Sequence, residues 1–267
     1  MGEKIRIGAL ISGGGTNLQA IIDACNDGRI HADVVFVGSD RPGVKGLDRA
    51  RDNNIPSFVV AYEPLIQAYR QDPAAFALPD DFDLSALLAK QHLFPAGAPR
   101  ERVRAFFCTR AAAEYRLLSQ IEAHGPADLL VLAGFMRNLT PYFIDRFNGD
   151  ANHPCIMNIH PALLPAFPGL DGYGDTVRYG CKVGGCSVHF VDYGEDSGPI
   201  IGQRAFPILE TDTLDDVQRK GLVQEWQLYP ECIQHFACGR LKVVKMTHRL
   251  KSGRVYQRSV VKIADDS

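Results

Sequence analysis

The N-terminal part of the sequence alternates short apolar runs with segments of helical periodicity. Apolar runs occupy Ile5–Ile11, Ala32–Val37 and Ser57–Val60, and helical patterns lie between them over residues 17–28 and 46–54. Strands that alternate with helices build a parallel sheet, because each helix carries the chain back to the same end of the sheet before the next strand begins. We therefore predict an α/β fold: a doubly wound, mostly parallel sheet with helices on both faces.

The same alternation continues after an interruption. Residues 62–109 show no sustained period apart from a short helical stretch at Leu84–Lys90, and we interpret them as an insertion that either covers one end of a binding cleft or decorates the surface. We expect a single domain, residues 1–267, whose tail, residues 242–267, alternates like a strand pair. The other predicted elements are helices at Arg110–Glu122, Pro141–Phe147 and Asp212–Phe236, the last capped by Thr211 or Thr213, and strands at Asp128–Ala133, Cys155–Ile159, Val183–Val191 and Pro199–Phe206.

Charge and cysteine content narrow the class of protein. The 29 basic residues nearly balance the 31 acidic ones, which argues against a nucleic-acid or membrane-surface partner. The seven cysteines are scattered and form no CxxC pair, so we expect neither a disulfide framework nor a metal site. The N-terminus lacks a signal-peptide pattern, and no apolar run has the length of a membrane span. These features predict a soluble protein of a reducing compartment, the cytoplasm.

A glycine-rich turn joins the first predicted strand to the first predicted helix. It reads SGGGTN, from Ser12 to Asn17. Backbone N–H groups of such a turn, together with the helix start behind it, form a site for anions, most often phosphate. A dinucleotide fingerprint would need glycine at position 18, where Leu18 stands, and the Walker lysine is missing too. We therefore favour a phosphate monoester over a nucleotide cofactor, with an ordinary glycine turn as the alternative.

Two polar residues occur at the end of the strand predicted at Cys155–Ile159. Asn158 and His160 are two positions apart, so their side chains point to the same side of the strand, and Pro161 ends the strand directly after them. Parallel sheets bind ligands at the carboxyl ends of their strands. A carboxamide beside an imidazole can stabilise a carbonyl oxygen that becomes an oxyanion. The pair is a candidate catalytic site, and a merely packed or solvated histidine is the alternative.

An acidic loop, YGEDSG, follows a later predicted strand. Asp196 lies in this loop, and a carboxylate brought near His160 would favour the charged imidazolium and fix its orientation. For Asp192 and Glu195 a solvated turn is the simpler interpretation. His189 lies within the strand between apolar neighbours, which indicates a structural or supporting role.

Four segments together resemble one enzyme family. The chain carries, in this order, the segments ISGGGTNLQAIIDAC, ADLLVLAGFMRNLTPYF, MNIHPALLPAFPG and SVHFVDYGEDSGPIIGQ. Their order and spacing resemble those of the phosphoribosylglycinamide formyltransferases of purine synthesis, over residues 5–61 and roughly 109–243. The resemblance implies the family's doubly wound formyltransferase fold. It also implies transfer of a formyl group from 10-formyltetrahydrofolate, as co-substrate, to the amine of glycinamide ribonucleotide.

The resemblance assigns roles to individual residues. Asn158, His160 and Asp196 match the family's catalytic asparagine, histidine and aspartate. The expected contacts to the phosphate and the amine of the substrate are Gly15, Thr16, Asn17 and Glu225. The expected folate contacts are Arg110, Met136, Arg137, Asn138, Leu139, Tyr193, Gly194, Glu195 and Ser197.

The mechanism implied in this way requires no metal. The substrate amine attacks the formyl carbon, while Asn158 and a protonated His160 stabilise the tetrahedral oxyanion. Asp196 keeps His160 charged and helps to order a water molecule that carries the proton. The expected partners are the two small-molecule substrates, and the oligomeric state stays open, with a homodimer as one alternative.

Two segments depart from the family pattern. Family members usually carry a histidine-containing start to the helix after LLPxFPG, whereas this chain has GLDGYGDT, residues 169–176. That difference leaves the local substrate contacts open. The segment from Tyr62 to Thr109 is also longer than the family's linker.

Three other functions stay open at this point. Formyltetrahydrofolate deformylase uses a similar trio with water as the nucleophile, but its histidine is typically followed by a second histidine, where this chain has Pro161. Formyltransferases of other amines, such as a sugar nucleotide or methionyl-tRNA, lack the SGGGTN loop in this form, and the near-neutral charge argues against tRNA. A non-catalytic folate- or nucleotide-binding module would not need all three polar residues.

Overall fold

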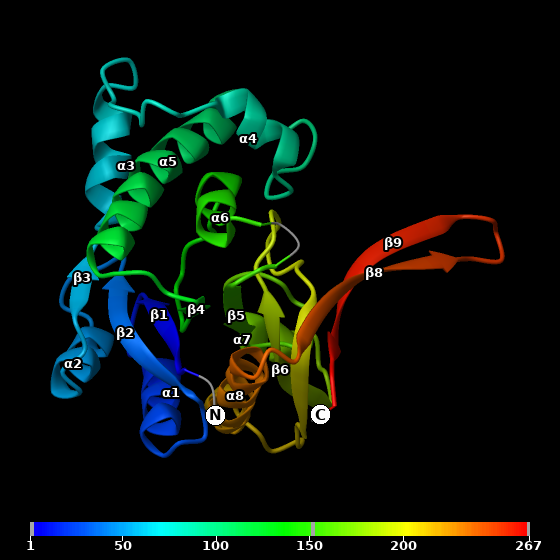
Figure 1. Cartoon of the computed structure of the whole chain (residues 1–267). Helices are drawn as coiled ribbons and strands as arrows, with labels where there is room; N and C mark the ends of the chain where they lie inside the picture. Colours follow the sequence, from blue (N-terminus) through cyan, green and yellow to red (C-terminus); the bar gives the residue numbers. More distant parts are fainter. Residues whose placement is uncertain (1–2, 151–152, 266–267) are drawn as a thin grey trace.

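The computed structural model describes residues 3–150 and 153–265 of the chain. A seven-stranded sheet lies at the centre with helices on both faces, and a two-stranded sheet stands apart from it (Figure 1). The strands are β1 (Ile5–Ile11), β2 (Ala32–Ser39), β3 (Ser57–Val59), β4 (Leu129–Leu132), β5 (Ile156–His160), β6 (Val183–Phe190), β7 (Ile200–Pro207), β8 (Leu241–Arg249) and β9 (Val255–Ile263).

The order of the strands in the large sheet is β3-β2-β1-β4-β5-β6-β7. β1 pairs in parallel with both β2 and β4, and the parallel pairs β2–β3 and β4–β5 extend the sheet on either side. β6 and β7 continue it in antiparallel pairing. The chain fills one half of the sheet from β1 outward to β3 and then returns to β4, which confirms the predicted doubly wound, mostly parallel sheet. Loops diverge at such a reversal, here between β1 and β4, and leave a crevice at the carboxyl ends of the strands.

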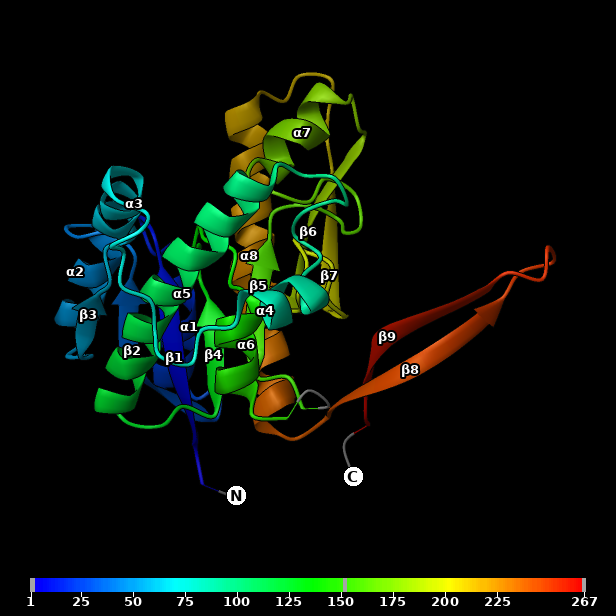
Figure 2. The ribbon, with the colours of Figure 1, turned by 90° about the horizontal axis from the view of Figure 1, so that it is seen from above.

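Helices pack on both faces of this sheet (Figures 1 and 2). Within the described residues, no helix is both long enough and apolar enough to cross a bilayer. The helices are α1 (Thr16–Asn26), α2 (Lys45–Asp52), α3 (Tyr62–Gln71), α4 (Leu84–Lys90), α5 (Arg100–Ala123), α6 (Pro141–Asn148), α7 (Gly172–Arg178) and α8 (Leu214–Ala237).

Side chains of the central strands alternate between two cores. Ile7 and Val131 belong to a buried cluster that also receives side chains from α1, α2 and α8. Leu10 and Leu130 belong to a second cluster, which contains Leu117 and other residues of α3, α5 and α6. Successive strand residues point to opposite faces, so a strand covered on both sides must be apolar at nearly every position. This is why the strands are visible in the sequence as unbroken apolar runs.

The segment expected to be irregular contains more helix than its pattern indicated. α3 buries Tyr62, Leu65 and Tyr69 on one helical face. Pro64 does not break this helix, because proline is tolerated in the first turn, where backbone N–H groups have no partner within the helix. α5 begins at Arg100, well before its predicted start, whereas α4 lies where the short helical stretch was predicted. The expectation of a single short helix between residues 62 and 109 is therefore wrong.

The C-terminal part contains a capped helix and a protruding hairpin. The Thr213 hydroxyl accepts a hydrogen bond from the Asp216 N–H, and the Asp216 carboxylate accepts one from the Thr213 N–H, so the two form the capping box that begins α8. β8 and β9 form an antiparallel pair where a strand pair was expected; residues 266 and 267 of that tail lie outside the described residues. Figure 2 shows the hairpin reaching away from the body, and Val243 and Val261 at its base pack against the core.

Candidate active site

The SGGGTN turn connects β1 to α1. Gly15 is the N-cap residue of α1 and has a left-handed backbone with a φ of 68°. A Cβ atom on Gly15 would lie 2.7 Å from the Cα atom of Gly46, so this position requires glycine. A Cβ atom on Gly13 or Gly14 would meet nothing within 4 Å. Arg49 anchors the turn, because its Nε donates a hydrogen bond to the Gly14 carbonyl oxygen at 2.9 Å.

The start of α1 has the properties of an anion site. The N–H groups in the first turn of a helix lack partners within the helix, and the helix dipole adds positive potential at this end. α1 carries no acidic residue in its first turn that would repel an anion. Thr16 is exposed here, whereas Asn17 is buried. The backbone at this end can therefore donate to a phosphate group.

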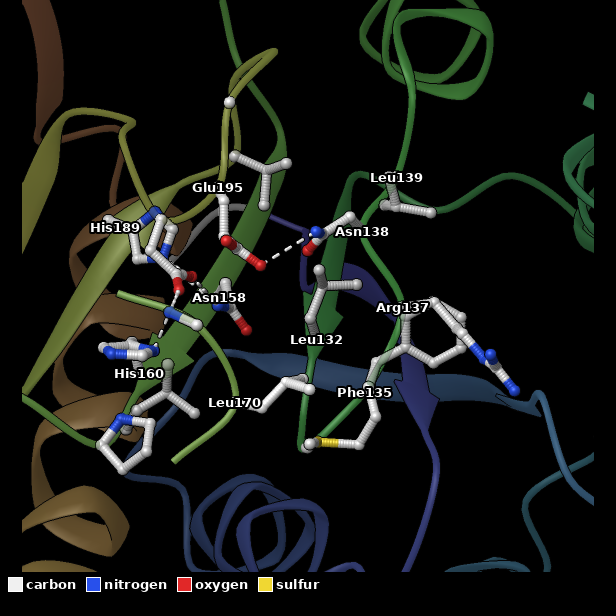
Figure 3. Close-up of a pocket in the computed structure, with 18 of the residues that line it drawn as sticks. Leu132, Phe135, Arg137, Asn138, Leu139, Asn158, His160, Leu170, His189 and Glu195 are labelled. Atoms are coloured by element: carbon white, nitrogen blue, oxygen red, sulfur yellow. Dashed lines mark hydrogen bonds and ion pairs between the residues drawn. The ribbon is translucent and has the colours of Figure 1, made fainter. Parts of the chain in front are cut away.

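A cavity of about 210 Å³ lies where the ends of β4 and β5 meet the loop between β6 and β7 (Figure 3). Most of the predicted site residues line it, although they come from widely separated segments of the chain. Leu132, Phe135, Leu170 and His189 line it as well and were not predicted to do so. The predicted residues that line it are Asn17, Met136, Arg137, Asn138, Leu139, Asn158, His160, Gly194, Glu195, Asp196 and Glu225.

The three candidate catalytic side chains lie within reach of one another in this cavity. The Nδ1 atom of His160 lies 3.2 Å from the Oδ2 atom of Asp196. The Nδ2 atom of Asn158 lies 3.4 Å from the Oδ1 atom of Asp196. β5 presents Asn158 and His160 on one side because residues two apart on a strand share a face. Asp196 reaches them from the loop between β6 and β7.

The surroundings of Asp196 hold its carboxylate in place. Its φ of 48° lies in the left-handed region, which a non-glycine residue keeps only where neighbouring contacts enforce it. The Gly169 N–H donates to the Oδ2 atom at 2.8 Å. Burial acts to raise the pKa of Asp196, but the contact with His189, the charge of His160 and the Gly169 hydrogen bond outweigh burial and lower the pKa below its usual value. The carboxylate is therefore ionised at neutral pH.

The imidazole of His160 lies between two acceptors. Its Nε2 atom is 2.7 Å from the carbonyl oxygen of Phe167, and its Nδ1 atom faces the Asp196 carboxylate. A carbonyl and an ionised carboxylate can only accept, so both contacts are satisfied when both ring nitrogens carry a proton. The side chain is 3% exposed, so water screens its charge poorly. The geometry thus favours an imidazolium at the edge of the cavity.

His189 supports the carboxamide of Asn158, a contact that the sequence pattern did not reveal. The Nδ2 atom of Asn158 lies 3.2 Å from the Nε2 atom of His189, and that Nε2 atom lies 3.5 Å from Asp196. The Nδ1 atom of His189 is 2.9 Å from the Phe190 carbonyl oxygen, which makes Nδ1 the donor and leaves Nε2 able to accept from Asn158. In the β5–β6 pairing, His189 stands directly opposite Asn158. The supporting role expected for His189 is therefore to hold the Asn158 amide in place.

The segment after β4 forms another wall of the cavity. The backbone N–H of Met136 donates to the Oγ atom of Ser12 at 2.8 Å, which ties this wall to the glycine-rich turn. The Nε atom of Arg137 donates to the buried carboxylate of Asp40 at 2.6 Å. These bonds fix the backbone of the segment, whose N–H and C=O groups then lie at set positions along the cavity.

The loop between β6 and β7 contacts two other parts of the chain: the segment after β4 and residues 62–109. The Nδ2 atom of Asn138 donates to the Oε1 atom of Glu195 at 3.1 Å (Figure 3). The backbone N–H of His92 donates to the Tyr193 carbonyl oxygen at 2.8 Å. Residues 62–109 therefore contact the loop that borders the cavity, although none of them is among the residues that line it. Their role as a cover stays a prediction.

Some predicted site residues lie outside this cavity. The guanidinium of Arg110 lies over the rings of Tyr62 and Phe106, at 5.1 Å and 4.8 Å from their centres, and it borders a separate hollow. Burial lowers the pKa of Arg110, and its Nε atom has no hydrogen-bond partner among the described residues. Four more predicted site residues lie outside the cavity. Gly15 and Thr16 directly precede Asn17 in the chain, and Tyr193 and Ser197 line a neighbouring hollow.

A buried carboxylate lies on the side of the cavity formed by α1 and α8. Glu225 is 5% exposed, and its Oε2 atom accepts a hydrogen bond from the Nδ2 atom of Asn17 at 2.6 Å. Its Oε1 atom accepts one from the Tyr173 hydroxyl, also at 2.6 Å. Hydrogen bonds to an ionised acceptor are stronger than those between neutral groups. Tyr173 belongs to GLDGYGDT, the segment in which the sequence departs from the family pattern.

Comparisons with known proteins agree with this geometry. The chain matches the formyl transferase family over residues 5–233. It is 35% identical over 239 residues to phosphoribosylglycinamide formyltransferase of Escherichia coli (strain K12), with 90% of each chain covered. It is 32% identical over 242 residues to the trifunctional purine biosynthetic protein adenosine-3 of Chironomus tentans, a match that covers 90% of this chain but spans 14% of that protein. Glycinamide ribonucleotide transformylase 1 from Symbiobacterium toebii has a similar structure, with a TM-score of 0.69 and 37% identity over 99% of this chain and 96% of that one.

Proposed function

The chain belongs to the formyl transferase family, and on that premise we propose that it transfers a formyl group from 10-formyltetrahydrofolate to the amine of glycinamide ribonucleotide, in purine synthesis. The Escherichia coli relative that carries the name of this activity matches the chain along 90% of both lengths. The observation that carries the proposal is the meeting of Asn158, His160 and Asp196 in a cavity that also contains Asn17, at the start of α1.

The central step is an acyl transfer. The amine nitrogen attacks the formyl carbon, and the formyl oxygen gains a negative charge that Asn158 and the charged His160 stabilise. The contacts of the Asn158 Nδ2 atom to His189 and Asp196, at 3.2 Å and 3.4 Å, are longer than the ~2.9 Å of a typical bond, so a developing oxyanion can replace them. The bond from the formyl carbon to the folate nitrogen then breaks, and the proton lost by the amine passes through water to that nitrogen.

Asp196 supports this step without contacting the formyl group. Its ionised carboxylate faces the Nδ1 atom of His160 and stabilises the positive charge of the ring. The Gly169 N–H donates to the carboxylate and the charged ring of His160 faces it, so little reorganisation is needed when the oxyanion forms. In this proposal the same carboxylate orders the water molecule that carries the proton.

We assign the two substrates to opposite sides of the cavity. The phosphate of the amine substrate is assigned to the backbone donors of Gly15 and Thr16, and the glycinamide side to Asn17 and Glu225. The folate is assigned to the space between the segment after β4 and the loop between β6 and β7, where backbone groups are fixed. The assigned folate contacts are Met136, Arg137, Asn138, Leu139, Tyr193, Gly194, Glu195 and Ser197, with Arg110 beyond the described cavity.

The proposal extends to partners and location. The folate co-substrate is the only cofactor that it includes, and the cytoplasm is the compartment that it assigns. The exclusion of nucleic acid and membrane surfaces as partners stays a prediction, as does a homodimer.

Incubation of the full chain with 10-formyltetrahydrofolate, with and without glycinamide ribonucleotide, tests the proposal. Tetrahydrofolate should form only when the amine is present, together with the formylated amine. Consumption of the folate without the amine would indicate a deformylase, and binding without consumption would indicate a binding module. A preference for another phosphorylated amine would correct the substrate.

A variant assay connects the activity to the site. His160→Ala should reduce turnover by about a hundredfold or more, the usual loss for one oxyanion-stabilising group. His248→Ala is the matched control, because His248 is exposed on β8, in the hairpin outside the cavity. Near-normal turnover in His160→Ala would exclude this site as the catalytic centre.

A further inference from the structure

Tyr173 is a buried tyrosine in the segment that departs from the family pattern. It lies in α7, is 6% exposed and donates its hydroxyl to the Oε1 atom of Glu225 at 2.6 Å. Burial and the adjacent Glu225 carboxylate raise the pKa of the phenol, so the hydroxyl stays protonated and remains a donor at neutral pH. The ring packs with Phe206 and Val217 in a small apolar cluster. The Tyr173 hydroxyl thus connects this cluster to Glu225.

Two glycines near Tyr173 allow its ring to take this position. Any larger residue at either glycine would clash with its surroundings. A Cβ atom on Gly221, in α8, would lie 2.1 Å from the Cζ atom of Tyr173. A Cβ atom on Gly172 would lie 2.7 Å from the carbonyl oxygen of Pro161, at the end of β5. Glycine at both positions lets α7 approach β5 and lets the phenol reach across α8. The departure from the family pattern therefore has a definite structural result, the seating of Tyr173.

The hydrogen bonds continue from Glu225 to Asn17. The Oε2 atom of Glu225 accepts from the Nδ2 atom of Asn17 at 2.6 Å. A carboxylate can only accept, so it selects the amide orientation in which Nδ2 faces Glu225. The Oδ1 atom of Asn17 is then left buried without a partner among the described residues, on a residue that lines the cavity. A buried acceptor without a partner is unfavourable, and a ligand that donates to it relieves that cost.

We propose that Tyr173 is a positioning residue that determines specificity: through Glu225 it holds Asn17 so that the Oδ1 atom accepts a hydrogen bond from an N–H or O–H group of the amine substrate. This inference rests on the proposed function. Both oxygens of Glu225 accept from protein donors, so the carboxylate is held in place and in turn holds the Asn17 amide. The Asn17 Oδ1 atom is therefore held ready to accept from a substrate donor beside Glu225. An analogue without that donor leaves the acceptor unpaired and binds more weakly.

Tyr173→Phe removes the hydroxyl and keeps the ring. The KM for glycinamide ribonucleotide should rise about tenfold, as expected when a buried hydrogen bond to a charged group is lost, while kcat and the KM for the folate stay within about twofold. Calorimetric titration of the amine substrate without folate should show the same loss in Kd. Tyr179→Phe is the matched control, since Tyr179 directly follows α7 and is 80% exposed; its kinetic constants should equal those of the unmodified chain.

A series of substrate analogues separates recognition from a general loosening of the site. Each analogue lacks one N–H or O–H donor, by methylation of an amide or by removal of a ribose hydroxyl. The unmodified chain should disfavour one of them about tenfold in kcat/KM, and Tyr173→Phe should reduce that discrimination to about twofold. General loosening would lower kcat/KM for all analogues alike and leave their ratios unchanged.

Glu225→Gln provides a second, independent variant. A glutamine side chain can donate as well as accept, so the orientation of the Asn17 amide is no longer selected, and discrimination among the analogues should fall although Tyr173 is present. The double variant should discriminate among the analogues no less than either single variant does. Tyr173 and Glu225 act through the same chain of hydrogen bonds, so their effects should not add. If Tyr173→Phe does not fold, the result with Glu225→Gln decides.

The possible outcomes distinguish this inference from the proposed function. Unchanged discrimination in both single variants, with normal formylation of glycinamide ribonucleotide, overturns the role of Tyr173 and leaves the function in place. Formylation of another amine overturns the proposed substrate, and the analogue series built on that amine then tests Tyr173. Failure to bind or formylate any phosphorylated amine overturns both.

Discussion

The Nδ1 atom of His160 lies 3.2 Å from the Oδ2 atom of Asp196, while the other ring nitrogen faces the carbonyl oxygen of Phe167. The ring is almost completely buried, so protein groups and not water determine its charge. Of these two neighbours only the carboxylate carries a full charge. The electrostatic contribution of His160 to catalysis therefore depends on Asp196.

Removal of the Asp196 charge should disable the reaction without unfolding the protein. Asp196→Asn keeps an oxygen that can accept from the Gly169 N–H but no longer stabilises an imidazolium. We expect kcat to fall about a hundredfold or more, with the KM of both substrates within a few fold. Steady-state kinetics measure this, and circular dichroism checks the fold. Asp215→Asn, an exposed carboxylate in the first turn of α8, should have no effect; a kcat of Asp196→Asn within threefold of normal contradicts the mechanism.

Replacement of His189 should affect turnover more than binding. His189→Phe removes the nitrogen that faces the Asn158 amide at 3.2 Å, so the amide is no longer held at its place in the cavity. We expect kcat to fall about tenfold, less than for a residue that contacts the oxyanion, and KM to change little. His248→Phe on the exposed hairpin serves as the control. A loss in KM alone would instead assign His189 to substrate binding.

Loss of the Ser12 hydroxyl should weaken folate binding. Ser12→Ala removes the acceptor of the Met136 N–H and releases the backbone of the segment after β4. One such bond contributes about 1 kcal/mol, so we expect the KM for the folate to rise about fivefold. The KM for the amine should stay unchanged, because that substrate is assigned to the other side of the cavity. Ser119→Ala, on the exposed side of α5, is the control; equal effects on both KM values would argue against a separate folate side.

Stability should decrease with rising pH because of Glu114. This residue is fully buried in α5, and burial raises its pKa to about 7 in spite of the hydrogen bonds that it accepts from Thr140 at 2.8 Å and 2.5 Å. The folded protein keeps this proton up to about pH 7, whereas the unfolded chain releases it near pH 4.5. Between these values the folded state binds more protons, so the free energy of unfolding should fall by about 3 kcal/mol as the pH rises.

A neutral replacement should remove that dependence. Glu114→Gln carries no charge at any pH, and its amide can still accept from the Thr140 N–H. Urea unfolding at pH 5 and pH 8 should give nearly equal free energies for this variant, apart from contributions of other groups that the unmodified chain shares. Glu122→Gln, an exposed position later in α5, should keep the original difference. The assignment fails if Glu114→Gln loses as much stability between the two pH values as the unmodified chain.

Features that depend on local chemistry could be predicted from the sequence. The strands around β1 are apolar at nearly every position because both faces are covered, and this is visible in any short window. The spacing of Asn158 and His160 fixes a shared side of one strand. Thr213 and Asp216 form a cap within four consecutive residues. Each of these conclusions needs no knowledge of which distant segments meet.

Features that depend on contacts between distant segments could not be predicted in the same way. The role of His189 follows from the pairing of β5 with β6, which no local pattern reveals. The position of Tyr173 follows from the approach of α7 to α8, made possible by Gly221 in α8. α3 lies in the segment without a sustained period, because its apolar face is short, and burial of that face in the core decides the outcome.

The pairing of β5 with β6 also bears on how preparations of this protein should be judged. Asn158 and His189 face each other only in one alignment of the two antiparallel strands. A slip by a single residue would turn His189 to the opposite face and bring Val188 or Phe190 beside Asn158. A refolded sample with that error can show ordinary strand and helix content in spectroscopy and yet contain no competent molecules. Counting active centres, by titration with a tight-binding substrate mimic, is therefore the appropriate measure of correctly aligned chains.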